Sequence, residues 1–113
     1  MKIVKNTIAL QTLKEMAHGS FGILIKGVVD IKRGVIAIGG DMHADEEQLL
    51  LSDGSQQEWL WGINIYPDEE GKNRVEFDSM INIRPSQKNF SRSVESPEIQ
   101  KQIRTIVDCM ITE

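Results

Sequence analysis

The 113-residue sequence has little cysteine and no long apolar run, and each shortage excludes a class of protein. A single cysteine, Cys109, cannot form an internal disulfide, which favours a reducing, cytoplasmic location. Apolar runs such as Val35–Ile38 are far shorter than the roughly 20 residues that a membrane-spanning helix needs. No apolar stretch typical of a secretory signal follows Met1. We therefore expect a cytoplasmic protein without a membrane segment.

Basic and aromatic residues are also scarce. The 13 Lys and Arg residues are outnumbered by 17 Asp and Glu residues, which gives a net charge of −4, and aromatic residues make up 5% of the chain. Because nucleic-acid binders rely on basic surfaces, often with aromatic stacking platforms, this composition predicts no nucleic-acid partner. Hydrophobic residues at 40% are typical of a globular protein, and the length suits one domain over residues 1–113.

The motifs of common cofactor sites are missing as well. The chain has no G-x-G-x-x-G, no G-x-x-x-x-G-K-[ST] and no G-x-S-x-G sequence. It has two histidines, which excludes a zinc site of three histidines. We therefore expect no cofactor.

What the sequence does contain is a regular series of hydrophobic patterns. Alternating apolar residues predict strands, spacings of three and four predict helices, and Ser96-Pro97-Glu98 is a typical start of the last helix. The expected strands are 1–5, 25–31, 35–39, 60–66 and 74–84, and the expected helices are 8–17, 44–51 and a last one after Ser96. This order, β-α-β-β-α-β-β-α, predicts an α+β domain with a largely antiparallel sheet and helices packed on one face.

The expected strands 60–66 and 74–84 carry most of the polar pattern. If a hairpin pairs Tyr66 with Arg74, Asn64 faces Glu76 and the even-numbered residues share one polar face. We predict that this face binds a small polar or anionic ligand. The predicted ligand-binding residues are Asn64, Tyr66, Asp78, Asn82 and Arg84. Arg84 would pair with the anion, because a guanidinium fits carboxylate and phosphate groups. An ordinary solvent-facing sheet surface would show the same pattern.

The segment that follows Arg84 is polar and partly basic. Arg84, Lys88 and Arg92 alternate there with Ser, Gln and Asn, a composition that could wrap an anion. A plain polar loop has the same composition, and this interpretation is favoured.

A second candidate site surrounds His43. With Asp78 or Asp45 as a partner, His43 could act as a general base, which would make the protein a small hydrolase or isomerase. His43 and Asp45, helped by Asp41 or Glu47, could also supply metal ligands. The favoured interpretation is that Asp45, Glu46 and Glu47 are first-turn residues of a helix, where acids suit the helix dipole, and that no metal binds.

A third interpretation is an interaction protein without catalysis. Trp59, Trp61 or a free sheet edge could join two copies into a homodimer or hold another partner.

The chain also resembles a known family. The residues that carry the resemblance are Val29-Asp30-Ile31, Gly39-Gly40, His43-Ala44-Asp45, Leu60-Trp61-Gly62 and Glu76-Phe77-Asp78-Ser79-Met80-Ile81-Asn82-Ile83-Arg84-Pro85. Together they are similar to a family of small bacterial proteins known only as a domain of unknown function. The resemblance covers most of the chain and implies one compact domain, without implying an activity.

Overall fold

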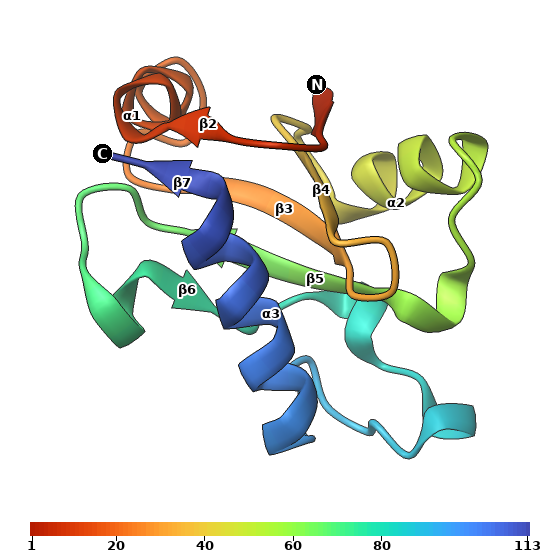
Figure 1. Ribbon diagram of the computed structural model, residues 1–113. Helices are drawn as coiled ribbons and strands as arrows, with labels where there is room; N and C mark the ends of the chain where they lie inside the picture. The colour runs from red at the N-terminus through yellow and green to blue at the C-terminus, as the bar shows by residue number, and fades with distance from the viewer.

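A five-stranded antiparallel sheet runs through the middle of the molecule (Figure 1). The computed structural model describes all residues from 1 to 113. The strands lie in the order β1-β4-β3-β5-β6, and each neighbouring pair is antiparallel. They are β1 (Lys2–Val4), β3 (Ile25–Asp30), β4 (Val35–Ile38), β5 (Leu60–Ile65) and β6 (Val75–Glu76). A separate parallel pair, β2 (Ile8–Ala9) and β7 (Ile111–Thr112), joins the two ends of the chain.

Three α-helices and four short 3₁₀ turns complete the fold. The helices are α1 (Leu10–His18), α2 (His43–Ser52) and α3 (Pro97–Met110), and the turns are Gln57–Trp59, Gly71–Arg74, Met80–Asn82 and Pro85–Gln87. None of the helices combines the length and the apolar character that crossing a membrane requires. The radius of gyration of 12.8 Å is that of one compact domain. The expected α+β class with a largely antiparallel sheet is confirmed.

Local chemistry explains where several elements begin and end. The carboxylate of Asp30 accepts hydrogen bonds from the backbone N–H groups of Lys32 and Arg33, both at 2.9 Å, and Gly34 takes the left-handed conformation with φ of 68° that closes the β3–β4 turn. Ser96 caps α3 by accepting from the N–H of Ile99 at 3.3 Å. The start expected for the first helix was early, because Ile8 and Ala9 pair with β7 instead.

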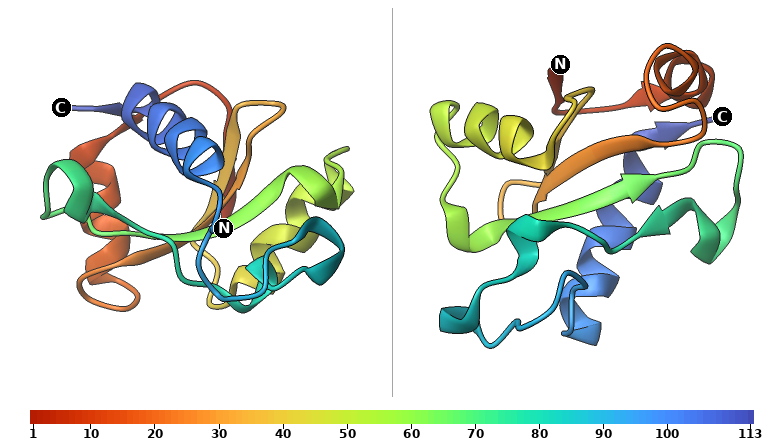
Figure 2. Two further views of the ribbon diagram at one scale, coloured as in Figure 1. Left: turned by 90° about the horizontal axis from the view of Figure 1, so that it is seen from below. Right: turned by 180° about the vertical axis from the view of Figure 1, so that it is seen from behind.

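Both faces of the sheet are covered. One face packs against α1 and α3 through a core that includes Leu13, Ile63 and Val107. The other face packs against α2, where Leu50 meets Val28 among other fully buried residues. Figure 2 shows α3 and α2 on opposite sides of the strands. The expectation that all helices share one face was therefore wrong, because central strands that are apolar on both faces need cover on both sides.

The strand expected over 74–84 is short. Its hairpin register is confirmed, since Asn64 pairs with Glu76 and the N–H of Tyr66 donates to the carbonyl of Arg74 at 2.8 Å. The ladder ends at Glu76, however, and residues 77–95, here called the edge segment, leave the sheet. The predicted alternation of buried odd-numbered and polar even-numbered residues ends at Ile81, because Asn82 and Arg84 are buried and Ile83 is 39% exposed. The backbone pairing predicted beyond Glu76 does not form.

Side chains of the edge segment replace the missing strand. The amide of Asn82 accepts from the N–H of Gly62 at 2.8 Å and donates to its carbonyl at 3.0 Å, as a neighbouring strand would. The Arg84 guanidinium donates to the carbonyls of Leu60 and Gln57. Its central carbon lies 4.2 Å from the centre of the Trp61 ring. The free edge of β5 is thus satisfied by two side chains.

Close packing at this edge requires glycine at position 62. A Cβ there would lie 2.5 Å from Cβ and Oγ of Ser79, which is closer than atoms can approach. Asn89 holds the far side of the edge segment, with its amide donating to the carbonyl of Asn82 at 2.8 Å and to that of Ser93 at 2.7 Å. The segment is therefore ordered by buried amides, although it has little regular structure.

We expect Asn82→Ala to lower the free energy of unfolding by about 2–4 kcal/mol, because it leaves the buried peptide of Gly62 without partners. Urea unfolding followed by circular dichroism measures this loss. Asn73→Ala, at an exposed position whose side chain makes no hydrogen bond, is the control and should change stability by less than about 0.5 kcal/mol. Equal effects of the two substitutions would contradict the role given to Asn82.

Candidate functional site

Several of the predicted polar residues meet in one cleft of about 210 Å³. It lies between the first residues of α2 and the start of the edge segment. We call it the polar cleft and define it by Lys26, His43, Asn64, Asp78 and Arg92. Three of the five, His43, Asn64 and Asp78, are residues that the sequence analysis singled out.

The sheet and α2 together position these side chains. Lys26 on β3 is the cross-strand partner of Asn64 on β5, so both side chains point to the face that α2 covers. His43 is the first residue of α2, and its Nε2 lies 2.8 Å from the carbonyl oxygen of Ile63. Because a carbonyl only accepts, the ring proton sits on Nε2. The imidazole is thereby fixed above β5.

Asn64 forms the polar floor of the cleft. Its Nδ2 donates to Oε1 of Glu76 at 2.9 Å, and the hydroxyl of Tyr66 donates to the same oxygen at 2.9 Å. The Asn64 side chain is 7% exposed, and its Oδ1 is buried without a hydrogen-bond partner. The two predicted site residues Asn64 and Tyr66 are therefore joined through Glu76.

Two cations and one carboxylate stand around this floor. The Nε of Arg92 donates to Oδ1 of Asp78 at 2.6 Å, and both side chains are about half exposed. Lys26 forms no ion pair, and its Nζ lies 4.9 Å from the centre of the Phe21 ring. Lys26 was not among the predicted site residues. A single basic residue in a strand that is otherwise mostly apolar was the signal that could have revealed it.

Burial lowers the pKa of His43 below its ordinary value, and the positive charge of Lys26 adds to this effect. The carbonyl of Ile63, the carboxylate of Asp78 and the amide of Asn64 act in the opposite direction without cancelling it. The imidazole is therefore neutral at pH 7. No hydrogen bond joins it to Asp78 or Asp45, so the acid–base pair considered for an enzyme is not formed here.

Three of the predicted ligand-binding residues lie outside the polar cleft, and one of them, Tyr66, lines a separate cavity. Asn82 is fully buried and Arg84 is 9% exposed, and both point at the edge of β5. The guanidinium of Arg84 donates to two backbone carbonyls and so stabilises the edge of β5. Arg84 does not line the polar cleft. The cations that do line the polar cleft are Lys26 and Arg92.

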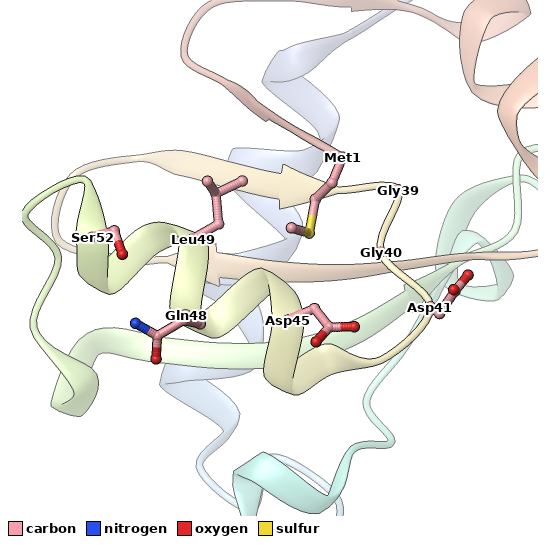
Figure 3. Close-up of a pocket in the computed structure, with 8 residues that line it drawn as sticks. All are labelled: Met1, Gly39, Gly40, Asp41, Asp45, Gln48, Leu49 and Ser52. Carbon is pink, nitrogen blue, oxygen red and sulfur yellow. The ribbon is translucent and has the colours of Figure 1, made fainter.

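Two of the acidic residues near His43 line a different cavity, of about 560 Å³ (Figure 3). Asp41 and Asp45 line it together with Met1 and Gln48, whereas His43 lines the polar cleft. Nowhere in the chain do three or more His, Cys, Asp or Glu side chains lie close enough together to hold a metal ion. The metal ligands considered for residues 41–47 are thus divided between two cavities.

Glu46 is a buried acid that the sequence analysis interpreted as a first-turn residue of a helix. Its side chain is fully buried, its Cγ packs against Gly40, and neither carboxyl oxygen has a hydrogen-bond partner. Burial raises the pKa of Glu46 to about 9, and the nearby charge of Asp45 contributes. The peptide at Gly40 and the charge of Lys26 oppose this shift. Glu46 is therefore protonated at neutral pH.

The family model described as "Protein of unknown function (DUF5674)" matches residues 2–110. The chain belongs to this family. No curated protein and no solved structure matches the chain. The resemblance seen in the sequence is thus confirmed, and because DUF5674 carries no assigned activity, function has to be argued from the polar cleft.

For this DUF5674 protein we expect His43 to titrate below its ordinary pKa of 6.5. The imidazole of His43 then becomes protonated at a lower pH in the folded state than in the unfolded state. The stability that neutral His43 contributes is therefore fully present above about pH 6.5 and is lost as the pH falls below this value. Asp78→Asn removes a charge that raises this pKa and should shift the midpoint lower still. NMR titration of the imidazole protons, assigned with His43→Gln, measures both values, and a midpoint above 6.5 would contradict the analysis.

Glu46→Gln should stabilise the protein increasingly as the pH rises. The wild-type carboxyl is protonated in the folded state and ionised in the unfolded state between about pH 4.5 and 9, so stability falls with pH across this window. We expect the variant to exceed wild type by about 1 kcal/mol or more at pH 8, and by much less at pH 5. Urea unfolding at both pH values tests this. Glu15→Gln, at an exposed position on α1, should show no such divergence.

Proposed function

We propose that the protein binds a small anion in the polar cleft and that it does so without catalysis. The observation that carries this proposal is the pair of cations, Lys26 and Arg92, beside a cleft with a polar floor. Only one carboxylate, Asp78, lines the same cleft. Because the His43 ring is neutral at pH 7, the charge around the cleft is positive, although the whole protein carries a net charge of −4.

Each of the two cations keeps donor groups that have no hydrogen-bond partner within the protein. Lys26 has no carboxylate partner, and its ammonium lies over the ring of Phe21, a contact that leaves its positive charge without a counter-charge from the protein. Arg92 uses its Nε for Asp78, which leaves its terminal Nη nitrogens for a ligand. A free ammonium and half of a guanidinium are groups that carboxylates and phosphates recognise.

The surroundings of the cleft favour a small ligand. Its volume of about 210 Å³ suits a molecule of a few non-hydrogen atoms. Met42 and Met80 line it with 59% and 64% of their surfaces exposed, and they place apolar groups beside the two cations. A lower local dielectric strengthens the attraction between these cations and an anion.

Binding is favoured over catalysis by the state of His43. Its one ring proton is directed at the carbonyl of Ile63, and no carboxylate orients the ring. Trp61 is 2% exposed within the core of this chain, so it does not serve as an anchor for a second copy. A homodimer through another surface, and a cytoplasmic location, stay predictions.

Isothermal titration calorimetry with inorganic phosphate at low ionic strength tests the proposal. We expect Lys26→Met, which keeps the apolar stem and removes the charge, to weaken phosphate binding about tenfold. Lys101→Met, which removes an exposed charge from α3, is the matched control and should change the affinity by less than about twofold. If phosphate, sulfate, glycolate and acetate all fail to bind the wild-type protein, or if both variants weaken binding equally, the proposal is wrong.

A further inference from the structure

The amide of Asn64 has a fixed orientation. Its Nδ2 donates at 2.9 Å to Oε1 of Glu76, and an ionised carboxylate only accepts hydrogen bonds. Exchanging the amide nitrogen and oxygen would place two acceptors against each other. The Oδ1 atom is therefore on the side of the amide away from Glu76, and the Asn64 residue lines the polar cleft.

This Oδ1 is an acceptor that the protein itself does not satisfy. It is buried, it has no hydrogen-bond partner, and the residue is 7% exposed. The neutral ring of His43 does not donate to it, because its only proton is directed at the carbonyl of Ile63. Lys26, the cross-strand neighbour, makes no hydrogen bond to Asn64 and lies against Phe21. A buried acceptor without a donor is costly, so a donor supplied by a ligand would be favoured.

Resting on the anion binding proposed above, we propose that the polar cleft selects small anions that carry an O–H group, and that Oδ1 of Asn64 accepts from this group. The anionic part would lie against Lys26 and Arg92, and the hydroxyl would reach the floor. A hydroxyl suits this position better than an ammonium does, since the two cations repel a positively charged donor. Hydroxy acids and hydrogen phosphates share this chemistry.

Two pairs of probes isolate the O–H group. At about pH 8, hydrogen phosphate and sulfate are both mainly tetrahedral dianions, but only hydrogen phosphate has an O–H group. Glycolate and acetate form a second pair that differs by one hydroxyl. An acceptor that would otherwise stay unpaired discriminates strongly against a ligand lacking the donor. We expect wild-type protein to bind phosphate about tenfold more tightly than sulfate, and glycolate more tightly than acetate.

Two variants test whether Asn64 is the atom that discriminates. Asn64→Leu keeps a similar size and removes the acceptor, so phosphate affinity should fall to that of sulfate while sulfate affinity changes by less than about twofold. Lys101→Met, at an exposed position of α3, leaves Asn64 and Glu76 unchanged and is the control, so the preference should persist in it. Titration calorimetry measures all four anions on each protein, with circular dichroism as the check of folding.

The possible outcomes separate this inference from the proposal on which it rests. If none of the four anions binds wild-type protein, both are wrong. If all bind and neither pair shows a preference, the anion site stands and the hydroxyl selectivity is wrong. A preference that survives in folded Asn64→Leu also overturns the role of Asn64. If Asn64→Leu fails to fold, the wild-type measurements still decide. A preference for phosphate over sulfate together with one for glycolate over acetate supports the selectivity, and a preference in only one of the two pairs refutes it.

Discussion

The structure depends on one side-chain amide that takes the place of a β-strand. Asn82 satisfies the peptide of Gly62 on the free edge of β5, and its Nδ2 also donates to the carbonyl of Arg92 at 3.0 Å. The N–H of Ser79 donates to the same carbonyl, again at 3.0 Å. The sheet edge, the start of the edge segment and the backbone of Arg92 are therefore tied together. This connection sets Asp78 and Arg92 beside the face that carries Asn64.

Replacing a strand with side chains is what creates a cleft in this place. Had the ladder continued past Glu76, Asp78 would lie opposite Gly62 in the sheet, and the even-numbered residues would form a flat surface. Instead the chain turns at Ser79, which packs into the space above Gly62. The walls of the polar cleft thus come from a local departure from regular structure, which buried hydrogen bonds make stable.

Sequence patterns revealed the elements better than they revealed the site. Turn and cap residues such as Gly34 and Ser96 act over a few residues, so their effects could be predicted. The alternation over 74–84 is equally compatible with a strand and with the edge segment, because the difference lies in where Asn82 and Arg84 find partners. Those partners are distant in sequence. His43, Asn64 and Asp78 could be singled out because their residue types suggest polar chemistry. That they lie in one cleft with Lys26 could not be predicted, because it depends on contacts between residues distant in sequence.

Among the buried polar atoms that lack hydrogen-bond partners, those of Glu46 and Asn64 differ in how the cost of burial can be lowered. The carboxyl of Glu46 takes up a proton, since burial raises its pKa to about 9, and so loses the charge that makes burial costly. The amide of Asn64 cannot lower its cost of burial in this way, because it does not take up a proton and its hydrogen bond to Glu76 fixes its orientation. While the His43 ring is neutral, Oδ1 of Asn64 has no donor within the chain. In the proposed complex, the hydroxyl of an anion bound in the polar cleft would supply this donor.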